Sequence, residues 1–140
     1  IKSYINQLIS NRTLLFSKYL GEEYNELLES DVSSLDQQFI LNIIGHINKN
    51  ISEPNLNVEK LAIDFYLSRS QLYRKIKALT GISANELIRK IRLEKAKELI
   101  ENTDHSIGVI CDFVGFSSPS YFSKCFKERF GVLPTDLKSE

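Results

Sequence analysis

The chain has 140 residues, and its 18 basic and 18 acidic side chains leave no net charge at neutral pH. This balance excludes a uniformly basic nucleic-acid coat and an acidic disordered tail, while 42% apolar residues are enough for a folded core. No apolar run approaches the roughly 20 residues of a membrane helix, so we expect no membrane contact by this segment. Because the chain starts at Ile1 and contains no Met, we expect it to be a piece of a larger protein.

The N-terminal quarter differs in character from the rest of the chain. Apolar residues recur at helical spacing before Gly21 and predict a helix. Residues 22–35 are acidic and rich in serine, which is typical of a linker. We therefore assign residues 1–35 to an N-terminal helix and an acidic linker that come from an upstream domain.

Three serines have the pattern of a helix-capping box, in which Gln or Glu follows three residues after the capping serine. These serines are Ser34, Ser68 and Ser83. With Asn57 as a further cap, the expected helices run from Ser34 to a break at 50–57, over 58–65, over 69–79 before Gly81, and over 84–100.

The last forty residues predict three more short helices. Ser106 can cap a helix that ends near Val114. Ser118 followed by Pro119 begins the next helix, which Gly131 ends, because proline suits the first helical position and glycine suits the end. A final short turn or helix is expected to begin at Pro134.

An internal repeat of helix, tight turn and helix is the strongest signal. Residues 61–68 align with residues 110–117, and after one inserted residue 72–87 align with 122–137. Apolar positions align with apolar ones and basic with basic, so each copy predicts a helix-turn-helix unit. A duplicated helical hairpin without DNA is the alternative, but basic residues at matching outward positions favour DNA binding.

The zero net charge hides a segregation of charges. Residues 66–100 carry nine basic and three acidic side chains, whereas residues 101–123 carry no Lys or Arg. We expect a cationic patch over the second helix of the first copy and the helix after it, with few acidic neighbours near 69–77. Such a patch attracts phosphates, although a merely solvated helix face remains the alternative.

The two copies resemble the DNA-binding domain of AraC/XylS-type transcription regulators over about residues 38–138. The second copy carries the more specific pattern, which runs through Val114-Gly115-Phe116, Ser120-Tyr121-Phe122-Ser123-Lys124 and Phe130-Gly131. The first copy matches through Leu61-Ala62 and Ser68-Arg69-Ser70-Gln71-Leu72-Tyr73-Arg74. Two departures are Cys111, where the family usually has Ala, and Val109, where Glu is usual, so the capping box behind Ser106 is incomplete.

The resemblance implies an all-α fold with an AraC-type domain at 36–140. It would contain helix-turn-helix subdomains at about 57–81 and 106–131, joined by a long connecting helix at about 83–101. The second helix of each subdomain would enter the major groove, and successive grooves on one DNA face lie about 34 Å apart.

The implied function is sequence-specific transcription regulation, expected to be activation, with repression left open. Residues 1–39 are similar to segments that join this domain to a receiver or a sensor histidine kinase, which implies the output region of a response regulator or hybrid two-component regulator. The implied partners are double-stranded DNA, RNA polymerase and a second copy of the protein, which would bind through the upstream region. The implied location is the bacterial cytoplasm, with an upstream sensor able to anchor the whole protein in a membrane.

The resemblance also implies which residues contact DNA. The candidates are Arg69, Ser70, Tyr73, Arg74 and Lys77 in the first copy, and Ser118, Pro119, Ser120, Ser123, Lys124 and Lys127 in the second. Arg74 is the best candidate for a base contact, since arginine can bond both acceptors of a guanine edge, with a phosphate contact as the alternative. We expect Lys77, Lys127 and Arg92 to contact phosphate or support structure. We expect Tyr121, Phe122, Phe126 and Phe130 in the core.

An enzyme would need a nucleophile, an acid–base pair or a metal cluster, and the sequence offers none. His46 and His105 lie apart from each other and from the cysteines, so we expect neither catalysis, a metal nor a cofactor. Cys111 and Cys125 are expected to be two buried free thiols. A helical interaction module that only mediates oligomerisation remains the alternative to a DNA-binding domain.

Overall fold

The computed structural model describes residues 34–138, and within this range the chain forms helices and no strand. The predicted N-terminal helix and most of the acidic linker lie outside the described residues. The helices are α3 (Ser34–Lys49), α4 (Val58–Asp64), α5 (Arg69–Thr80), α6 (Ala84–Asn102), α7 (Ile107–Phe113), α8 (Pro119–Phe130) and α9 (Pro134–Lys138). The expected all-α class is confirmed.

Five of the described helices, α4 to α8, begin at the predicted polar caps. The Ser68 hydroxyl accepts a hydrogen bond from the Gln71 backbone N–H, and the Gln71 side chain accepts one from the Ser68 N–H, which completes a capping box. Asn57, Ser83, Ser106 and Ser118 likewise each accept a hydrogen bond from the backbone N–H three residues further on. Their side chains thus satisfy donors that the first helical turn leaves free.

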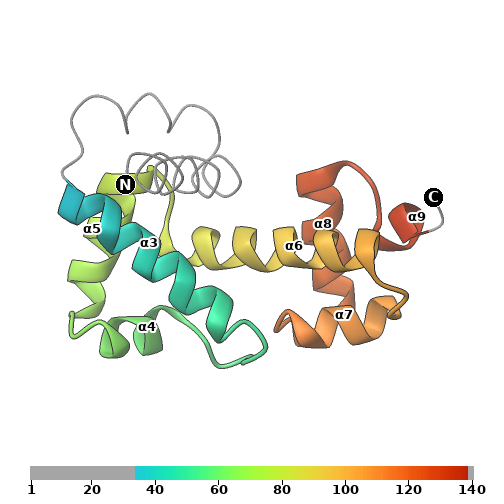
Figure 1. Ribbon diagram of the computed structural model, residues 1–140, viewed down its shortest axis with the longest axis horizontal. Coiled ribbons are helices and arrows are strands. Elements are labelled where there is room, and N and C mark those ends of the chain that lie inside the picture. The colour runs from blue at the N-terminus through green and yellow to red at the C-terminus, as the bar shows by residue number, and fades with distance from the viewer. Residues whose placement is uncertain (1–33, 139–140) are drawn as a thin grey trace, which may run out of the picture.

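The two helix-turn-helix units lie along α6. Figure 1 shows α3, α4 and α5 around one end of this helix and α7, α8 and α9 around the other. With 19 residues, α6 is about 28 Å long at 1.5 Å per residue. It ends at Asn102, two residues later than expected, and the Thr103 N–H bonds back to the Leu99 carbonyl there.

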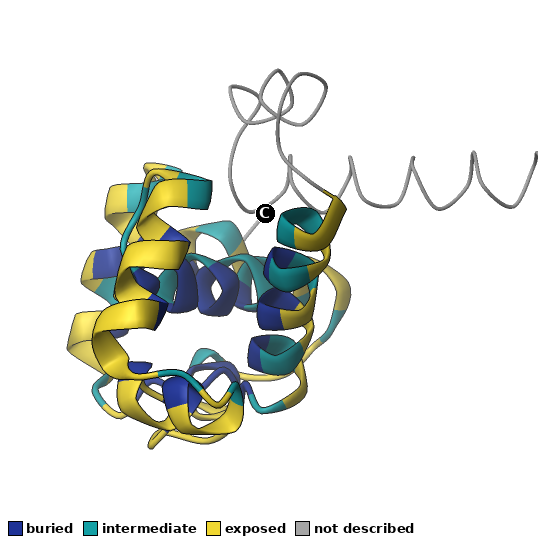
Figure 2. Ribbon diagram, turned by 90° about the vertical axis from the view of Figure 1, so that its left-hand side faces the viewer, coloured by how far each residue is buried: buried dark blue, intermediate teal, exposed yellow. Residues whose placement is uncertain are grey.

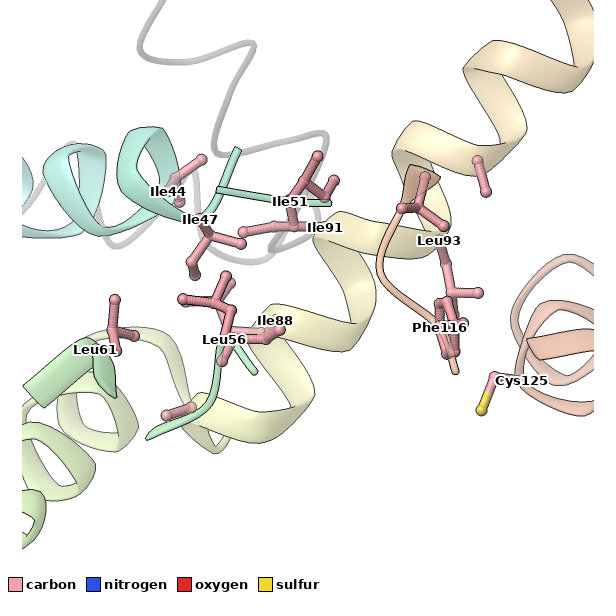
Figure 3. Close-up of a cluster of buried hydrophobic side chains, with 14 of the residues drawn as sticks. Ile44, Ile47, Ile51, Leu56, Leu61, Ile88, Ile91, Leu93, Phe116 and Cys125 are labelled. Carbon is pink, nitrogen blue, oxygen red and sulfur yellow. The ribbon is translucent and has the colours of Figure 1, made fainter. Parts of the chain in front are cut away.

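A single hydrophobic cluster runs through both units. In Figure 3, Ile88 and Ile91 of α6 lie with Ile47 and Leu56 of the first unit, while the second unit adds Phe116 and Cys125. Figure 2 shows that the buried residues face the interior and that the outer helix surfaces are exposed. This shared core makes α6 a structural element of both units.

One predicted core residue lies elsewhere. Phe122 and Phe126 are fully buried and Phe130 packs against the core, but Tyr121 is 48% exposed. Tyr121 is on the outward side of α8, and its hydroxyl accepts a hydrogen bond from Arg89 at 3.2 Å. The expectation that Tyr121 belongs to the core is therefore wrong, because the helical turn rotates it away from Phe122.

Candidate nucleic-acid interface

One face of α5 is polar and open to solvent. Ser70, Tyr73, Arg74 and Lys77 are all exposed, and they follow the i, i+3, i+4, i+7 spacing of one helical stripe. On the opposite face, Leu72 and Ile76 are fully buried. The helix cannot rotate without exposing these two residues, so its core face holds the stripe outward.

The same arrangement recurs on α8. Its stripe consists of Ser120, Ser123, Lys124 and Lys127, which are exposed except for the half-buried Ser123. Phe122 and Phe126 are fully buried on the other side. The repeat therefore places Ser120, Ser123, Lys124 and Lys127 at the positions that Ser70, Tyr73, Arg74 and Lys77 hold on α5.

The turns that lead into α5 and α8 have the same hydrogen bonds. The Leu67 N–H donates to the Ala62 carbonyl at 2.9 Å, and the Phe116 N–H donates to the Cys111 carbonyl at 3.1 Å. Ala62 and Cys111 are both buried small residues, as expected where two helices approach closely. The second helix of each unit thus leaves its turn in an equivalent way.

The basic residues of the first unit have more partners than the sequence predicts. Arg69 forms an ion pair of 3.1 Å with Glu59 of α4, an acidic neighbour that the sequence pattern did not identify. Both side chains are exposed, and such a pair contributes only about 0–1 kcal/mol. The Lys77 ammonium donates to the Gly81 carbonyl at the end of α5, at 2.9 Å. Arg74 bonds weakly along its own helix, at 3.4 Å from the Ser70 carbonyl.

At the start of α8, Ser118 has a structural task. Its hydroxyl accepts a hydrogen bond from the Tyr121 N–H at 3.3 Å and lies 3.1 Å from the Ser120 hydroxyl. Pro119 is the exposed first residue of the helix. These residues shape the tip of α8 and offer short polar groups to a ligand, whereas Arg74 and Tyr73 on α5 offer long ones.

Two open hollows join the stripe on α5 to the tip of α8. The first, of about 850 Å³, is lined by Val58, Arg69, Ser70, Tyr73, Arg74 and Asn85. The second, of about 410 Å³, is lined by Pro54, Leu56, Asn57, Asn85, Ile88, Arg89, Arg92, Gly115, Phe116, Ser117 and Tyr121. Asn85 belongs to both hollows, and no acidic side chain lines the second one. The two hollows therefore combine apolar residues with arginine and asparagine side chains, and no acidic residue of the described part of the chain lines either one.

Arg89 is a candidate that sequence reasoning missed. It projects from α6 into the second hollow, where it donates to Tyr121 of α8. This hydrogen bond raises the pKa of Arg89, so the guanidinium stays charged. The only sequence signal was its place in the cationic segment 66–100, which does not show which basic residue faces the surface between the stripes.

Arg92 also lines the second hollow, but only 8% of it is exposed. Its side chain is buried and donates to the carbonyls of Gly115, Glu53 and Leu56 at 2.6, 3.0 and 3.5 Å. A guanidinium that already holds three backbone carbonyls inside the protein cannot reach a phosphate. Of the two roles expected for Arg92, the structure supports the structural one.

The histidines and cysteines form no site. His46 bonds to Asp64 at 2.8 Å beside the Phe65 ring, and His105 is exposed in a loop. Cys111 and Cys125 are buried free thiols, as predicted. Among residues 34–138, no cluster of His, Cys, Asp and Glu is grouped to hold a metal, and no helix has the length and apolarity to cross a membrane.

Comparison with known proteins gives one consistent result. A family model described as "Helix-turn-helix domain" matches residues 61–140. A histidine kinase, P4, from Formosa agariphila is 33% identical over 135 residues. The match covers 96% of this chain but only 10% of that protein, so the chain spans a small part of its relative.

Solved structures show the same fold. The C-terminal domain of AraT, a response regulator from Geobacillus stearothermophilus, superposes with a TM-score of 0.68 and 34% identity, over 79% of this chain and 88% of that one. The DNA-binding domain of the transcriptional factor AdpA, solved with a target DNA, superposes with a TM-score of 0.66 and 25% identity, over 71% and 88% of the two chains.

Proposed function

Because the chain belongs to the AraC/XylS-type helix-turn-helix family of DNA-binding regulator domains, we propose that its two polar stripes read adjacent major grooves. The observation that carries the proposal is their matched register on α5 and α8, each fixed by a buried apolar face. An α-helix fits the major groove of B-form DNA, where the edges of base pairs are distinguishable.

The first stripe supplies most of the base recognition. Arg74 is exposed on α5 and long enough to bond both acceptors of a guanine edge. Tyr73 and Arg74 correspond in the repeat to Ser123 and Lys124, so α8 carries a shorter and a less directional side chain at these positions. We assign to α8 mainly phosphate contacts, through Lys124 and Lys127, and recognition of DNA shape.

The remaining candidates flank these reading residues. Arg69 can exchange its exposed Glu59 partner for a phosphate, since the ion pair is weak. Five further candidates lie at the ends or edges of the stripes and position the helices against the DNA backbone. They are Ser70, Lys77, Ser118, Pro119 and Ser120. We assign Arg89 and Asn85 to the DNA segment between the two grooves, because both line the hollow between the stripes.

The biological setting that we propose is supported by the similarity to known proteins. The similarity to a histidine kinase and to the C-terminal domain of a response regulator supports a role as output domain of a two-component or hybrid two-component protein in the bacterial cytoplasm. The whole protein would activate transcription by contacting RNA polymerase, and would dimerise through its upstream region, with an upstream sensor able to anchor it in the membrane. A transcriptional activator, RhaS from Escherichia fergusonii, is 29% identical over 131 residues.

A DNA-binding titration at increasing salt tests the proposal. The parent chain should shift a pool of random duplexes, with an affinity that falls as salt rises. The charge-reversed variant Arg69→Glu/Arg74→Glu should lose the shift, while Lys49→Glu/Lys95→Glu, with the same change in charge outside the stripes, should keep most of it. Equal binding by both variants, or no shift by the parent chain, contradicts the proposal and favours a helical interaction module.

A further inference from the structure

The Arg92 guanidinium lies at the junction of the two helix-turn-helix units. It belongs to α6 and is only 8% exposed. One nitrogen, Nη1, donates to the Gly115 carbonyl in the turn of the second unit, at 2.6 Å. The other, Nη2, donates to the carbonyls of Glu53 and Leu56 in the α3–α4 loop of the first unit, at 3.0 and 3.5 Å. One side chain therefore holds backbone from both units.

Gly115 permits this junction to close. Its φ of 89° lies in the left-handed region, and a Cβ atom there would come within 2.5 Å of the Ile51 carbonyl and 2.8 Å of the Arg92 guanidinium. The turn of the second unit thus packs against the 51–56 loop of the first with no space for a side chain. Arg92 and Gly115 therefore lie where the two units contact each other.

Burying the Arg92 guanidinium carries a free-energy cost. Arg92 is buried, which leaves its charge poorly solvated and lowers its pKa, and its Nε atom has no hydrogen-bond partner. A buried cation contributes little to stability over an apolar side chain of similar volume. Its planar fork of donors does, however, fix the positions of the carbonyls that it holds.

We infer that Arg92 is a positioning residue that sets the spacing of half-sites this domain accepts, by clamping the unit that carries α5 to the unit that carries α8. The inference rests on the proposed function, since only a protein that reads two half-sites has a spacing preference. One inserted base pair moves the second half-site by about 3.4 Å and rotates it by about 35°. A rigid clamp rejects that change, whereas a loose junction tolerates it.

Arg92→Lys tests this inference. The variant keeps the charge, but one ammonium cannot donate in the directions of Gly115, Glu53 and Leu56 together. Duplexes selected from a random library with the parent chain supply the two half-sites, which are then rebuilt with one base pair removed, unchanged or one base pair added. The parent chain should prefer its own spacing by about tenfold or more, and the variant by less than about threefold.

Two controls distinguish a loss of folding in Arg92→Lys from a loss of its preference for one half-site spacing. Affinity for a duplex with the first half-site alone should stay unchanged in the variant, which shows that the α5 unit is folded. Lys95→Met, a substitution on α6 outside the junction, should keep the spacing preference of the parent chain. If Arg92→Lys discriminates between spacings as strongly as the parent chain does, the inference is wrong.

A measurement without DNA distinguishes failure of the inference about Arg92 from failure of the proposed function. Spin labels at Ala78→Cys on α5 and Glu128→Cys on α8, both exposed positions, report the distance between the two helices. The distance distribution should be narrow in the parent chain and broader with Arg92→Lys. A distribution that stays narrow overturns the inference, while a parent chain that never binds DNA overturns the proposed function alone.

Discussion

Tyr66 and Gly115 hold the same place in the two helix-turn-helix units, and both have positive φ angles, of 56° and 89°. Their surroundings differ. The Tyr66 side chain is 96% exposed, whereas a Cβ atom at Gly115 would collide with Ile51 and Arg92. The left-handed conformation is therefore strained at Tyr66, which has a side chain, and unstrained at Gly115, which has none.

Substitutions at these two positions should have opposite effects. Tyr66→Gly removes a side chain that packs on nothing and relieves the left-handed strain, so it should stabilise the fold by about 0.5–1 kcal/mol. Gly115→Ala adds both strain and a collision, and should destabilise by at least about 2 kcal/mol. Urea unfolding followed by circular dichroism measures both. A loss of stability in Tyr66→Gly contradicts the assigned backbone conformation.

Arg74 is expected to determine one base pair of the target. Arg74→Ala should weaken binding to the selected site by about 1–3 kcal/mol and relax the preference at a single position. Lys127→Ala should weaken binding to all sequences alike, because a phosphate contact carries no base information. Competition titrations with single-base variants of the site compare the two proteins. If Arg74→Ala leaves every preference intact, Arg74 contacts only phosphate.

Phe126 and Tyr121 test the inward and outward faces of α8. Phe126→Ala leaves a cavity in the core and should cost about 3–5 kcal/mol of stability. Tyr121→Phe removes only a hydroxyl at the surface and should cost less than about 1 kcal/mol. Thermal or urea unfolding gives both values. A small loss in Phe126→Ala would mean that α8 is rotated from the described position.

The two thiols should be inert in the folded chain. Cys111 is buried, and burial raises its pKa, so the reactive thiolate is disfavoured. A disulfide-exchange reagent should modify Cys111 and Cys125 only as fast as the fold opens, and both at once in denaturant. Rapid labelling of the native chain contradicts this assignment.

Because the pKa of Cys111 is raised in the folded chain, the contribution of this thiol to stability should fall as pH rises above the ordinary pKa of a thiol.

The sequence predicted the elements that depend on local rules. The capping box at Ser68 follows from spacing along one helix, and the structure confirms it. The prediction that Tyr121 lies in the core with Phe122, Phe126 and Phe130 is wrong. The repeat itself carried the better signal, since Tyr121 aligns with Gln71, which is polar and exposed.

The features that sequence reasoning missed depend on residues distant along the chain. Arg69 pairs with Glu59 because α4 and α5 fold against each other, and Arg89 meets Tyr121 because α8 crosses α6. The role of Arg92 requires three carbonyls from two separate loops. No periodicity within one helix reports such contacts, so only the folded structure distinguishes these arginines.

Methylation interference on a selected duplex tests the central claim most directly, because guanine N7 lies in the major groove. Two stripes that read adjacent grooves should give two groups of interfering guanines on one face of the DNA, about 10 base pairs apart. Arg74→Ala should remove interference within one group only. A single group, or guanines spread around the whole circumference, would contradict the account of two reading helices held along α6.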